Sequence, residues 1–433
     1  MRRIITAFLM VSAVSVMAMS QWQFSRTFIP AGIKVSGNGI HGIAVDKAGK
    51  VWIEPYDVSD SLIKTGTTST YQKVRCIYVY NPDGTAVDTI KTILIGSTRD
   101  TLFNSGRGLA SDPTGDNIFL STFDMVYKIN ATTRQGVSKV QPVPNNSLTA
   151  VAVDSLGEVF AGLVVPGIGG IKIYGSNMAF IGNVTDTSRG FSRTLAVSNN
   201  GNDVYWPAYT NSNIVKYHSA NGSLGPYTPT DTLAKGAVCE SMTWRKKTGH
   251  LWISGGYRTF PPTGSNLSPA AWYAYDLTAK KVVDGFFWNP VPGGASRTDP
   301  RPRGIAFSPG GDTCYVAMFN LDSATVQMWT KIPTSVQQLP RVGQVPEGYA
   351  LEQNFPNPFN PTTTIQFTLA KPGLTSLFIY DMLGRDIATL MHQEMAAGTF
   401  RVSFDASRIP SGTYIYELRS GDARIMKKMT LVK

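Results

Sequence analysis

Short strand-like segments, separated by turns, run along the last part of this chain. They occupy residues 364–369, 374–380, 400–404, 413–418 and 425–432. Most of them alternate apolar and polar residues, the period of strands that bury one face, and the turn Lys371-Pro372-Gly373 separates the first two. Many short strands at regular spacing predict a small immunoglobulin-like β-sandwich.

A different, repeated pattern fills the middle of the chain. A short apolar strand leads into a polar turn, often with Gly, and a second strand with an aromatic residue follows. The six copies span residues 41–53, 107–120, 149–160, 193–206, 240–253 and 303–316. A third strand follows each copy, and the closer copies are spaced by about one four-stranded propeller blade. The repeat predicts an all-β, six-bladed β-propeller, with a seventh blade inside an insertion as the alternative and residues 24–33 as a closing strand.

The repeat also resembles a known group of propellers. One copy begins His41-Gly42-Ile43-Ala44-Val45-Asp46 and another begins Thr149-Ala150-Val151-Ala152-Val153-Asp154. This pattern is similar to that of NHL-repeat and gluconolactonase-like propellers. The resemblance covers roughly residues 35–330 and implies the fold more than any activity.

Composition and charge fit a turn-rich protein with anionic partners. The chain of 433 residues holds 41 Gly and 26 Pro, and its net charge is +11. A basic surface favours polysaccharide, lipopolysaccharide phosphate or carboxylated ligands, and a merely solvated basic surface is the alternative. We expect no nucleic-acid role, because the chain has no Lys/Arg-rich run or nucleic-acid motif. Cys76, Cys239 and Cys314 lack metal-type spacing, so buried thiols are expected, with a Cys239–Cys314 disulfide as the alternative.

The beginning of the chain predicts a secretory signal peptide. Arg2-Arg3 precedes a mostly apolar stretch at residues 4–16, and the small residues of Ala18-Met19-Ser20 follow. No later stretch is long and apolar enough to predict a transmembrane span.

A proline-rich motif precedes the C-terminal strands. It reads Asn354-Phe355-Pro356-Asn357-Pro358-Phe359-Asn360-Pro361, and Gly384, Gly412 and Lys427-Lys428 follow it. From about Val345 to Lys433 the chain closely resembles the type A C-terminal sorting domain of the type IX secretion system of Bacteroidota and their relatives. The resemblance implies export by the type IX machinery through the periplasm and the outer membrane. It also implies removal of this domain during export, followed by tethering to surface lipopolysaccharide or release.

These signals divide the chain into four predicted parts. They are a signal peptide at 1–20, the propeller at 21–330, a linker at 331–345 and the sorting domain at 346–433. The predicted location is extracellular or on the cell surface.

One residue in each copy of the repeat is expected at one mouth of the propeller channel. Ala44, Ala110, Ala152, Ala196, Thr243 and Ala306 define a common register, and the residue three positions earlier lies at the mouth. The six mouth residues are His41, Arg107, Thr149, Arg193, Glu240 and Arg303. Guanidinium groups match carboxylate and phosphate geometry, so these residues predict an anion-binding ring. The alternative is that they form structural hydrogen bonds and ion pairs that close the ring.

Metal-dependent catalysis is less favoured. The gluconolactonase resemblance implies a divalent cation held by Glu, Asn and Asp side chains at the channel, yet Glu240 is the one carboxylate among the six mouth residues. No cofactor is therefore predicted, with Ca²⁺ as the alternative. Asp46, Asp112 and Asp154 begin hairpin turns, where Asp accepts backbone hydrogen bonds. No nucleophile–base–acid set can be assembled from the sequence, so a function without catalysis is favoured over an enzyme.

The second half of the repeat region is rich in aromatic residues. Most of them are expected to pack between blades, and Phe286-Phe287-Trp288 stands at the edge of an insertion. Aromatic faces stack on sugars and other ligands, so these three residues are the predicted surface aromatic site.

Three functions fit these observations. The favoured one is an exported cell-surface or secreted propeller that binds an anionic or glycan ligand or a protein partner. The alternatives are a metal-dependent lactonase or hydrolase of the gluconolactonase type, and a self-associating structural component of an extracellular surface assembly.

Overall fold

The computed structural model contains two compact units, Trp22–Lys331 and a second one that includes Ile332–Lys433. It describes residues 22–28, 39–56, 61–64, 71–165, 170–186, 190–208, 210, 213–256, 267, 270–288, 301–319, 326–331, 336–338, 348–407 and 409–433. The predicted signal peptide at 1–20 lies outside these residues, as does most of the predicted linker. In the described part, no helix is long and apolar enough to cross a membrane.

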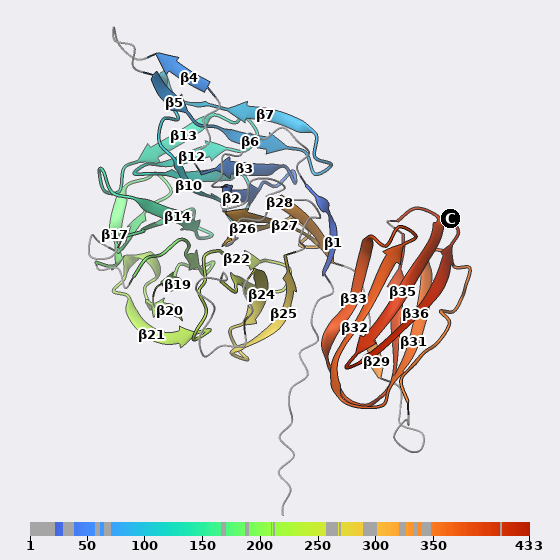
Figure 1. Cartoon of the computed structure of the whole chain (residues 1–433). Helices are drawn as coiled ribbons and strands as arrows, with labels where there is room; N and C mark the ends of the chain where they lie inside the picture. The colour runs from blue at the N-terminus through green and yellow to red at the C-terminus, as the bar shows by residue number, and fades with distance from the viewer. Residues whose placement is uncertain are drawn as a thin grey trace, which may run out of the picture. The chain divides into compact units, whose positions relative to one another are not determined.

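Six antiparallel sheets of four strands each form Trp22–Lys331 (Figure 1). The first contains β2 (Ile40–Val45), β3 (Val51–Pro55), β6 (Ile77–Tyr80) and β7 (Ala86–Ile90). The second contains β10 (Gly106–Ser111), β11 (Asn117–Thr122), β12 (Val126–Asn130) and β13 (Gly136–Val140). The third contains β14 (Leu148–Val153), β15 (Val159–Leu163), β16 (Ile171–Tyr174) and β17 (Phe180–Thr185).

The other three sheets follow in chain order. The fourth contains β18 (Ala196–Val197), β19 (Asp203–Ala208), β20 (Asn213–His218) and β21 (Thr228–Leu233), with the 3-10 turn η1 (Gly222–Leu224) before β21. The fifth contains β22 (Met242–Arg245), β23 (His250–Ser254), β24 (Ala271–Asp276) and β25 (Lys281–Phe287). The sixth contains β26 (Arg301–Phe307), β27 (Thr313–Phe319), β28 (Val326–Lys331) and β1 (Trp22–Thr27).

The first strands of the six sheets contact one another in a closed ring. β2 lies against β10 and β26, and β14, β18 and β22 continue the contacts from β10 round to β26. The N-terminal strand β1 pairs with β28, so Trp22 lies opposite Lys331 and both ends of this unit belong to one sheet. The closing strand thus begins earlier than the predicted segment 24–33. Two additional hairpins are β4 (Ser61–Lys64) with β5 (Tyr71–Val74) and β8 (Thr92–Ile95) with β9 (Thr98–Thr101).

Apolar side chains fill the spaces between neighbouring sheets. Trp52 of the first sheet and Ile118 of the second are fully buried in one cluster. Trp22 of the closing strand meets Trp252 of the fifth sheet edge to face, with ring centroids 5.6 Å apart. Burying such surfaces stabilises the ring, at about 25 cal/mol per Å² of apolar area. The three cysteines are also buried and form no disulfide, which confirms the prediction of buried thiols.

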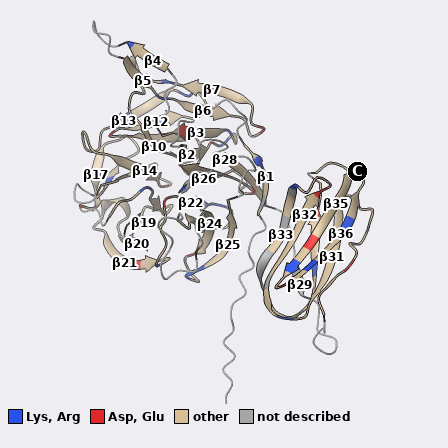
Figure 2. Ribbon diagram, in the orientation of Figure 1, with Lys and Arg blue, Asp and Glu red and all other residues tan. Residues whose placement is uncertain are grey.

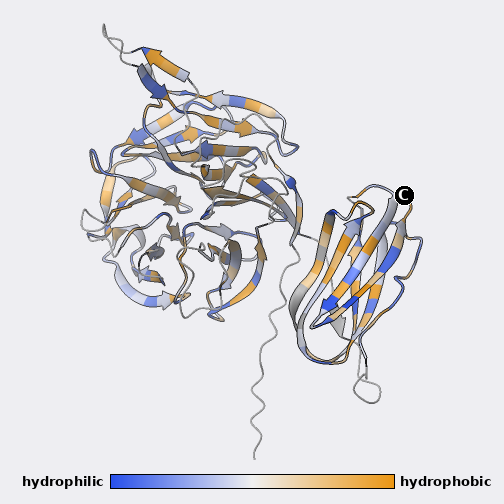
Figure 3. Ribbon diagram, viewed as in Figure 1, coloured by the Kyte–Doolittle hydropathy of each residue, from blue (hydrophilic) through white to orange (hydrophobic). Residues whose placement is uncertain are grey.

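Two antiparallel sheets of four strands form the described part of the second unit. One contains β29 (Val336–Gln338), β34 (Gly398–Asp405), β31 (Thr362–Leu369) and β30 (Ala350–Leu351). The other contains β33 (Asp386–Met395), β32 (Gly373–Asp381), β35 (Gly412–Ser420) and β36 (Ala423–Leu431). Figure 3 shows apolar and polar residues alternating along these strands, and side chains from both sheets share one core. The prediction of an all-β chain is confirmed for the described residues, in which the 3-10 turn η1 is the only helical segment.

Candidate functional site

A cavity of about 350 Å³ lies at the centre of the ring and is lined by residues of all six first strands. Each of these strands is at one end of its sheet. An end strand leaves one row of backbone N–H and C=O groups unpaired within the sheet. The cavity lining therefore offers backbone hydrogen-bonding groups beside apolar side chains such as Ile43, Leu109 and Leu195.

Basic side chains gather at one end of this cavity. His41, Arg193 and Arg303 are among the residues that line it. The Nε of Arg303 lies 2.6 Å from Oε2 of Glu240, and both side chains are buried. Nη1 of the same guanidinium lies 3.2 Å from Nε2 of His41. An ion pair and an imidazole from distant segments of the chain thus meet at this mouth.

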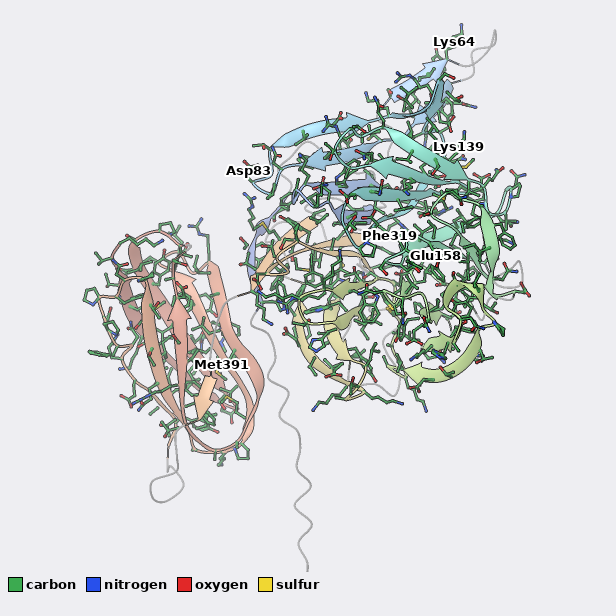
Figure 4. The ribbon with its side chains drawn as sticks, turned by 180° about the vertical axis from the view of Figure 1, so that it is seen from behind. Lys64, Asp83, Lys139, Glu158, Phe319 and Met391 are labelled. Atoms are coloured by element: carbon green, nitrogen blue, oxygen red, sulfur yellow. The ribbon has the colours of Figure 1, made fainter. Side chains whose placement is uncertain are left out.

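Aromatic rings support two of the guanidinium groups. Arg107 lies over Tyr56 and Phe123, at 5.1 and 5.3 Å from the ring centroids, and its Nη1 donates a hydrogen bond of 2.9 Å to the Tyr56 hydroxyl. Arg303 lies 4.7 Å from the ring centroid of Phe319, which Figure 4 labels near the middle of the ring of sheets. Such stacking holds a guanidinium in place without neutralising its charge.

The charges of three arginines all act on the imidazole of His41. Burial lowers the pKa of His41 well below 6.5, and the positive charges of Arg303, Arg193 and Arg107 lower it further. The imidazole is therefore neutral at neutral pH, and its surroundings favour an anion over a second proton.

Glu54 is an acidic residue beside this mouth that the sequence did not indicate. Its side chain is buried and packs against Gly106, where an added Cβ would lie 1.3 Å from Oε1. Neither carboxyl oxygen has a hydrogen-bond partner among the described residues. Burial raises the pKa of Glu54 well above its usual value, although Arg107 opposes the shift. Burial thus favours the neutral form of Glu54, whereas Arg107 favours the charged form.

The six predicted mouth residues fall into three groups. His41, Arg193 and Arg303 line the cavity. Glu240 pairs with Arg303, and the charge of Arg107 lowers the pKa of His41. Thr149 is fully buried and is not among the cavity-lining residues. A Cβ added to Gly162 of β15 would lie 2.8 Å from Cγ2 of Thr149, so this β14 side chain packs closely against β15.

Folding stability is expected to fall as the pH falls below about 6.5. The unfolded chain binds a proton at His41 near that pH, whereas the folded protein binds it only at lower pH. Protonation therefore favours the unfolded state in this window. Denaturation of wild type and His41→Gln at pH 7.5 and 5.0, followed by Trp fluorescence, should show a smaller loss of stability on acidification in the variant. Equal losses in both proteins would contradict this role of His41.

The opposite end of the cavity is crossed by a lysine. Nζ of Lys246, which follows β22, donates a hydrogen bond to the Pro113 carbonyl of the turn after β10. The two neighbouring lysines, Lys47 and Lys247, pair with Asp116 and Asp312. Lys246 thus bridges two turns at the end of the cavity away from the arginines.

The turn aspartates act as the sequence predicted. Oδ1 of Asp46, Asp112 and Asp154 accepts the backbone N–H four residues later.

Within the part of the chain that the structure describes, no group of three or more His, Cys, Asp or Glu side chains is placed to hold a metal ion.

The predicted surface aromatic site does not form one patch. Phe286 is 2% exposed, and its ring stacks on Trp329 with centroids 4.6 Å apart. The expectation of a surface position is wrong for Phe286, since adjacent residues of the strand β25 point to opposite faces. Phe287 is exposed, whereas Trp288 is partly buried. The ring centroids of Trp288 and Trp272 are 6.2 Å apart.

The proline-rich motif of the second unit is partly built into its core. Nδ2 of the buried Asn354 donates hydrogen bonds to the Pro356 carbonyl and to Oγ1 of Thr363, both at 3.0 Å. Phe359 is 2% exposed and belongs to the core, whereas Phe355 is 81% exposed.

The other predicted sorting residues lie at turns and on one strand. Gly384 has φ +78° in the turn after β32, a conformation that favours glycine, and Gly412 begins β35. Lys427 and Lys428 belong to the end strand β36, where Figure 2 shows basic residues in blue.

Comparisons with known proteins identify this second unit. Residues 353–432 match the family described as "Secretion system C-terminal sorting domain". No curated protein matches the chain. Among solved structures, a protein of unknown function from Bacteroides caccae is similar over 59% of this chain and 81% of its own length, at 10% sequence identity and a TM-score of 0.40. Residues 353–432 therefore carry a C-terminal sorting domain of the type IX secretion system, which indicates export to the cell surface or beyond it.

Proposed function

We propose that Trp22–Lys331 is a six-bladed β-propeller that binds an anionic, hydroxyl-rich ligand at the channel mouth around His41. An acidic glycan fits this description. In this proposal the signal peptide comprises residues 1–20, the linker 331–345 and the immunoglobulin-like sorting domain 346–433. After export the propeller acts at the cell surface, tethered to lipopolysaccharide, or free in the surroundings.

The observation that carries the proposal is the convergence of three guanidinium groups on His41. They outnumber the two acidic residues at the mouth, Glu240 and Glu54, and burial raises the pKa of Glu54 well above its usual value. Guanidinium groups bind carboxylates and phosphates through paired hydrogen bonds. A cation at this mouth would be repelled by the same charges, which argues against the metal-dependent lactonase.

The size and walls of the cavity support a polar ligand. A volume of about 350 Å³ lies in the range of small-molecule sites. The end strands around it present backbone donors and acceptors, which suit the hydroxyl groups of a sugar better than an apolar chain. A short acidic oligosaccharide would place its carboxylate at Arg193 and Arg303 and its hydroxyl groups against the strands.

Arg193→Gln is expected to weaken binding of an acidic oligosaccharide about 10- to 100-fold, since a hydrogen bond to a charged group contributes about 1.5–3 kcal/mol. Arg193 lines the cavity and is partly exposed, so the fold should tolerate the change. Calorimetry of the full chain with galacturonate and galactose oligomers of equal length measures the effect. Arg99→Gln, on the hairpin strand β9, is the matched control and should bind as wild type does.

Two results would overturn the proposed function. One is that neither oligomer binds in low salt, where charge attraction is strongest. The other is that neutral and acidic oligomers bind equally and Arg193→Gln changes neither affinity.

A further inference from the structure

The two sheets of the sorting domain differ in the face that each turns away from the core. In the strands β31 and β34, alternate residues such as Ile365 and Val402 belong to the core, so the residues between them face outward. The outward pairs are Thr364 with Ser403, Gln366 with Arg401 and Thr368 with Thr399. This polar surface, which we call the β31 face, is what a sheet with one side in water requires.

The outward surface of the other sheet is apolar and basic instead. Leu377 of β32 and Leu418 of β35 belong to the core, so the residues that alternate with them face outward. They form three rows across β32, β35 and β36, which we call the β35 face: Phe378–Glu417–Met426, Tyr380–Ile415–Lys428 and Ser376–Arg419–Arg424. Met426 is 47% exposed, and Phe378, Tyr380 and Ile415 are partly exposed. Apolar and aromatic side chains thus lie on a face that the core does not use.

Two arginines are held in place on the β35 face. The guanidinium of Arg419 lies 5.0 Å from the ring centroid of Phe378, and its Nη2 donates hydrogen bonds of 3.1 Å to the Tyr380 hydroxyl and 2.8 Å to Glu417. Arg424 pairs with the same carboxylate. The side chain of Glu417 is 0% exposed, whereas those of Arg419 and Arg424 are 47% and 61% exposed. One carboxylate thus serves two guanidinium groups, and the three rows keep a net positive charge.

The composition of the β35 face is that of a protein interface. Tyr, Phe, Met and Arg are enriched where proteins bind one another, and Tyr and Arg often contribute most of the affinity. The contact with Phe378 orders the Arg419 side chain before a partner arrives, which lowers the entropy lost on binding. The β31 face offers no such apolar or aromatic anchors among its three outward pairs.

We propose that the β35 face is the surface by which the type IX secretion machinery recognises this chain, and that it docks there on an acidic protein surface. The match of residues 353–432 to the secretion sorting domain implies that the machinery handles this domain. The positive charge of the face complements acidic side chains, and its apolar rows suit the water-free centre of an interface. The inference does not rest on the proposed glycan binding around His41.

Photo-crosslinking of the full chain in a host with type IX secretion tests the contact directly. Benzoylphenylalanine in place of Met426 should crosslink to a protein that mass spectrometry identifies as a component of the secretion machinery. The same photoreactive residue in place of Thr364, on the β31 face, should give no such product.

Two exposed positions test whether the β35 face is needed for export. Met426→Asp should lower the exported fraction about 10-fold or more, because like charges that meet in an interface are strongly unfavourable. Arg424→Gln, which leaves Arg419 to pair with Glu417, should lower it about 3-fold through the lost charge attraction. Thr364→Asp and Arg401→Gln make the same changes on the β31 face and should be exported as wild type is. Pulse proteolysis of each variant measures the fold independently.

Three results would overturn the proposal. The first is a folded Met426→Asp variant that is exported as wild type is, or an equal loss of export in Thr364→Asp. The second is a crosslink from position 426 to a second copy of the chain alone, which would make the β35 face a self-association surface. The third is a crosslink to lipopolysaccharide alone. If Met426→Asp does not fold, the crosslink and Arg424→Gln decide the question.

Discussion

Replacing Glu240 by alanine is expected to destabilise the ring of sheets by about 3–5 kcal/mol, the usual cost of breaking a buried ion pair by removing one partner. Glu240 and Arg303 are 0% and 2% exposed at their side chains and lie 2.6 Å apart. The variant leaves the Arg303 charge buried beside His41 without that carboxylate, in a region where two further arginines already act. No comparable cost applies to an exposed pair.

Trp fluorescence during chemical denaturation isolates this effect. All eight tryptophans of the chain lie in Trp22–Lys331, so the sorting domain does not contribute to the signal. Asp116→Ala, which breaks the exposed contact with Lys47, is the control and should change stability little. The double variant Glu240→Leu with Arg303→Met should recover much of the loss, since apolar residues can replace a buried ion pair. A loss in Glu240→Ala as small as in the control would show that solvent reaches the pair.

The register read from the sequence recurs in all six sheets. Each register residue, from Ala44 to Ala306, pairs with an aromatic residue of the next strand. This regularity was predictable, because an apolar strand, a turn and an aromatic strand recur in every copy. It also placed His41, Arg193 and Arg303 together, since equivalent residues of successive sheets meet around the ring.

The aromatic rings that stack on Arg107 and Arg303 were not predicted, although they occur at a regular position in the repeat. Trp52, Phe119 and Tyr315 are the register partners in three sheets. Tyr56, Phe123 and Phe319 each follow these partners by four residues. Spacing alone does not show that a ring stacks on a guanidinium, because the stacking depends on a side chain of a neighbouring strand.

Two other features depended on contacts between distant segments. Glu54 is buried because Gly106, in the next sheet, leaves room for its carboxyl group. Phe286 is buried because β1, from the other end of the unit, completes the neighbouring sheet and brings Trp22 to within 5.9 Å of its ring. Local pattern shows which residues alternate, but not which face of an outer strand another sheet will cover.

The two phenylalanines of the proline-rich motif are expected to respond in opposite ways to alanine. Phe359→Ala should destabilise the sorting domain by about 3–5 kcal/mol, because Phe359 is 2% exposed within its core. The backbone of Phe359 also bonds to Thr430 and Val432, which ties the motif to the end of the chain. Phe355→Ala should change stability by no more than about 0.5 kcal/mol, since Phe355 is 81% exposed.

Export should follow the fold of this domain. In a host with type IX secretion, immunoblots of periplasm, cell surface and medium should show Phe359→Ala retained in the periplasm or degraded there. Phe355→Ala should be exported as wild type is, and pulse proteolysis of both variants measures the fold independently. Export of an unfolded Phe359→Ala domain would contradict this expectation. It would mean that the secretion machinery recognises an extended segment rather than the folded domain. Loss of export in a folded Phe355→Ala variant would indicate that the secretion machinery contacts this exposed ring, because Phe355 does not belong to the core.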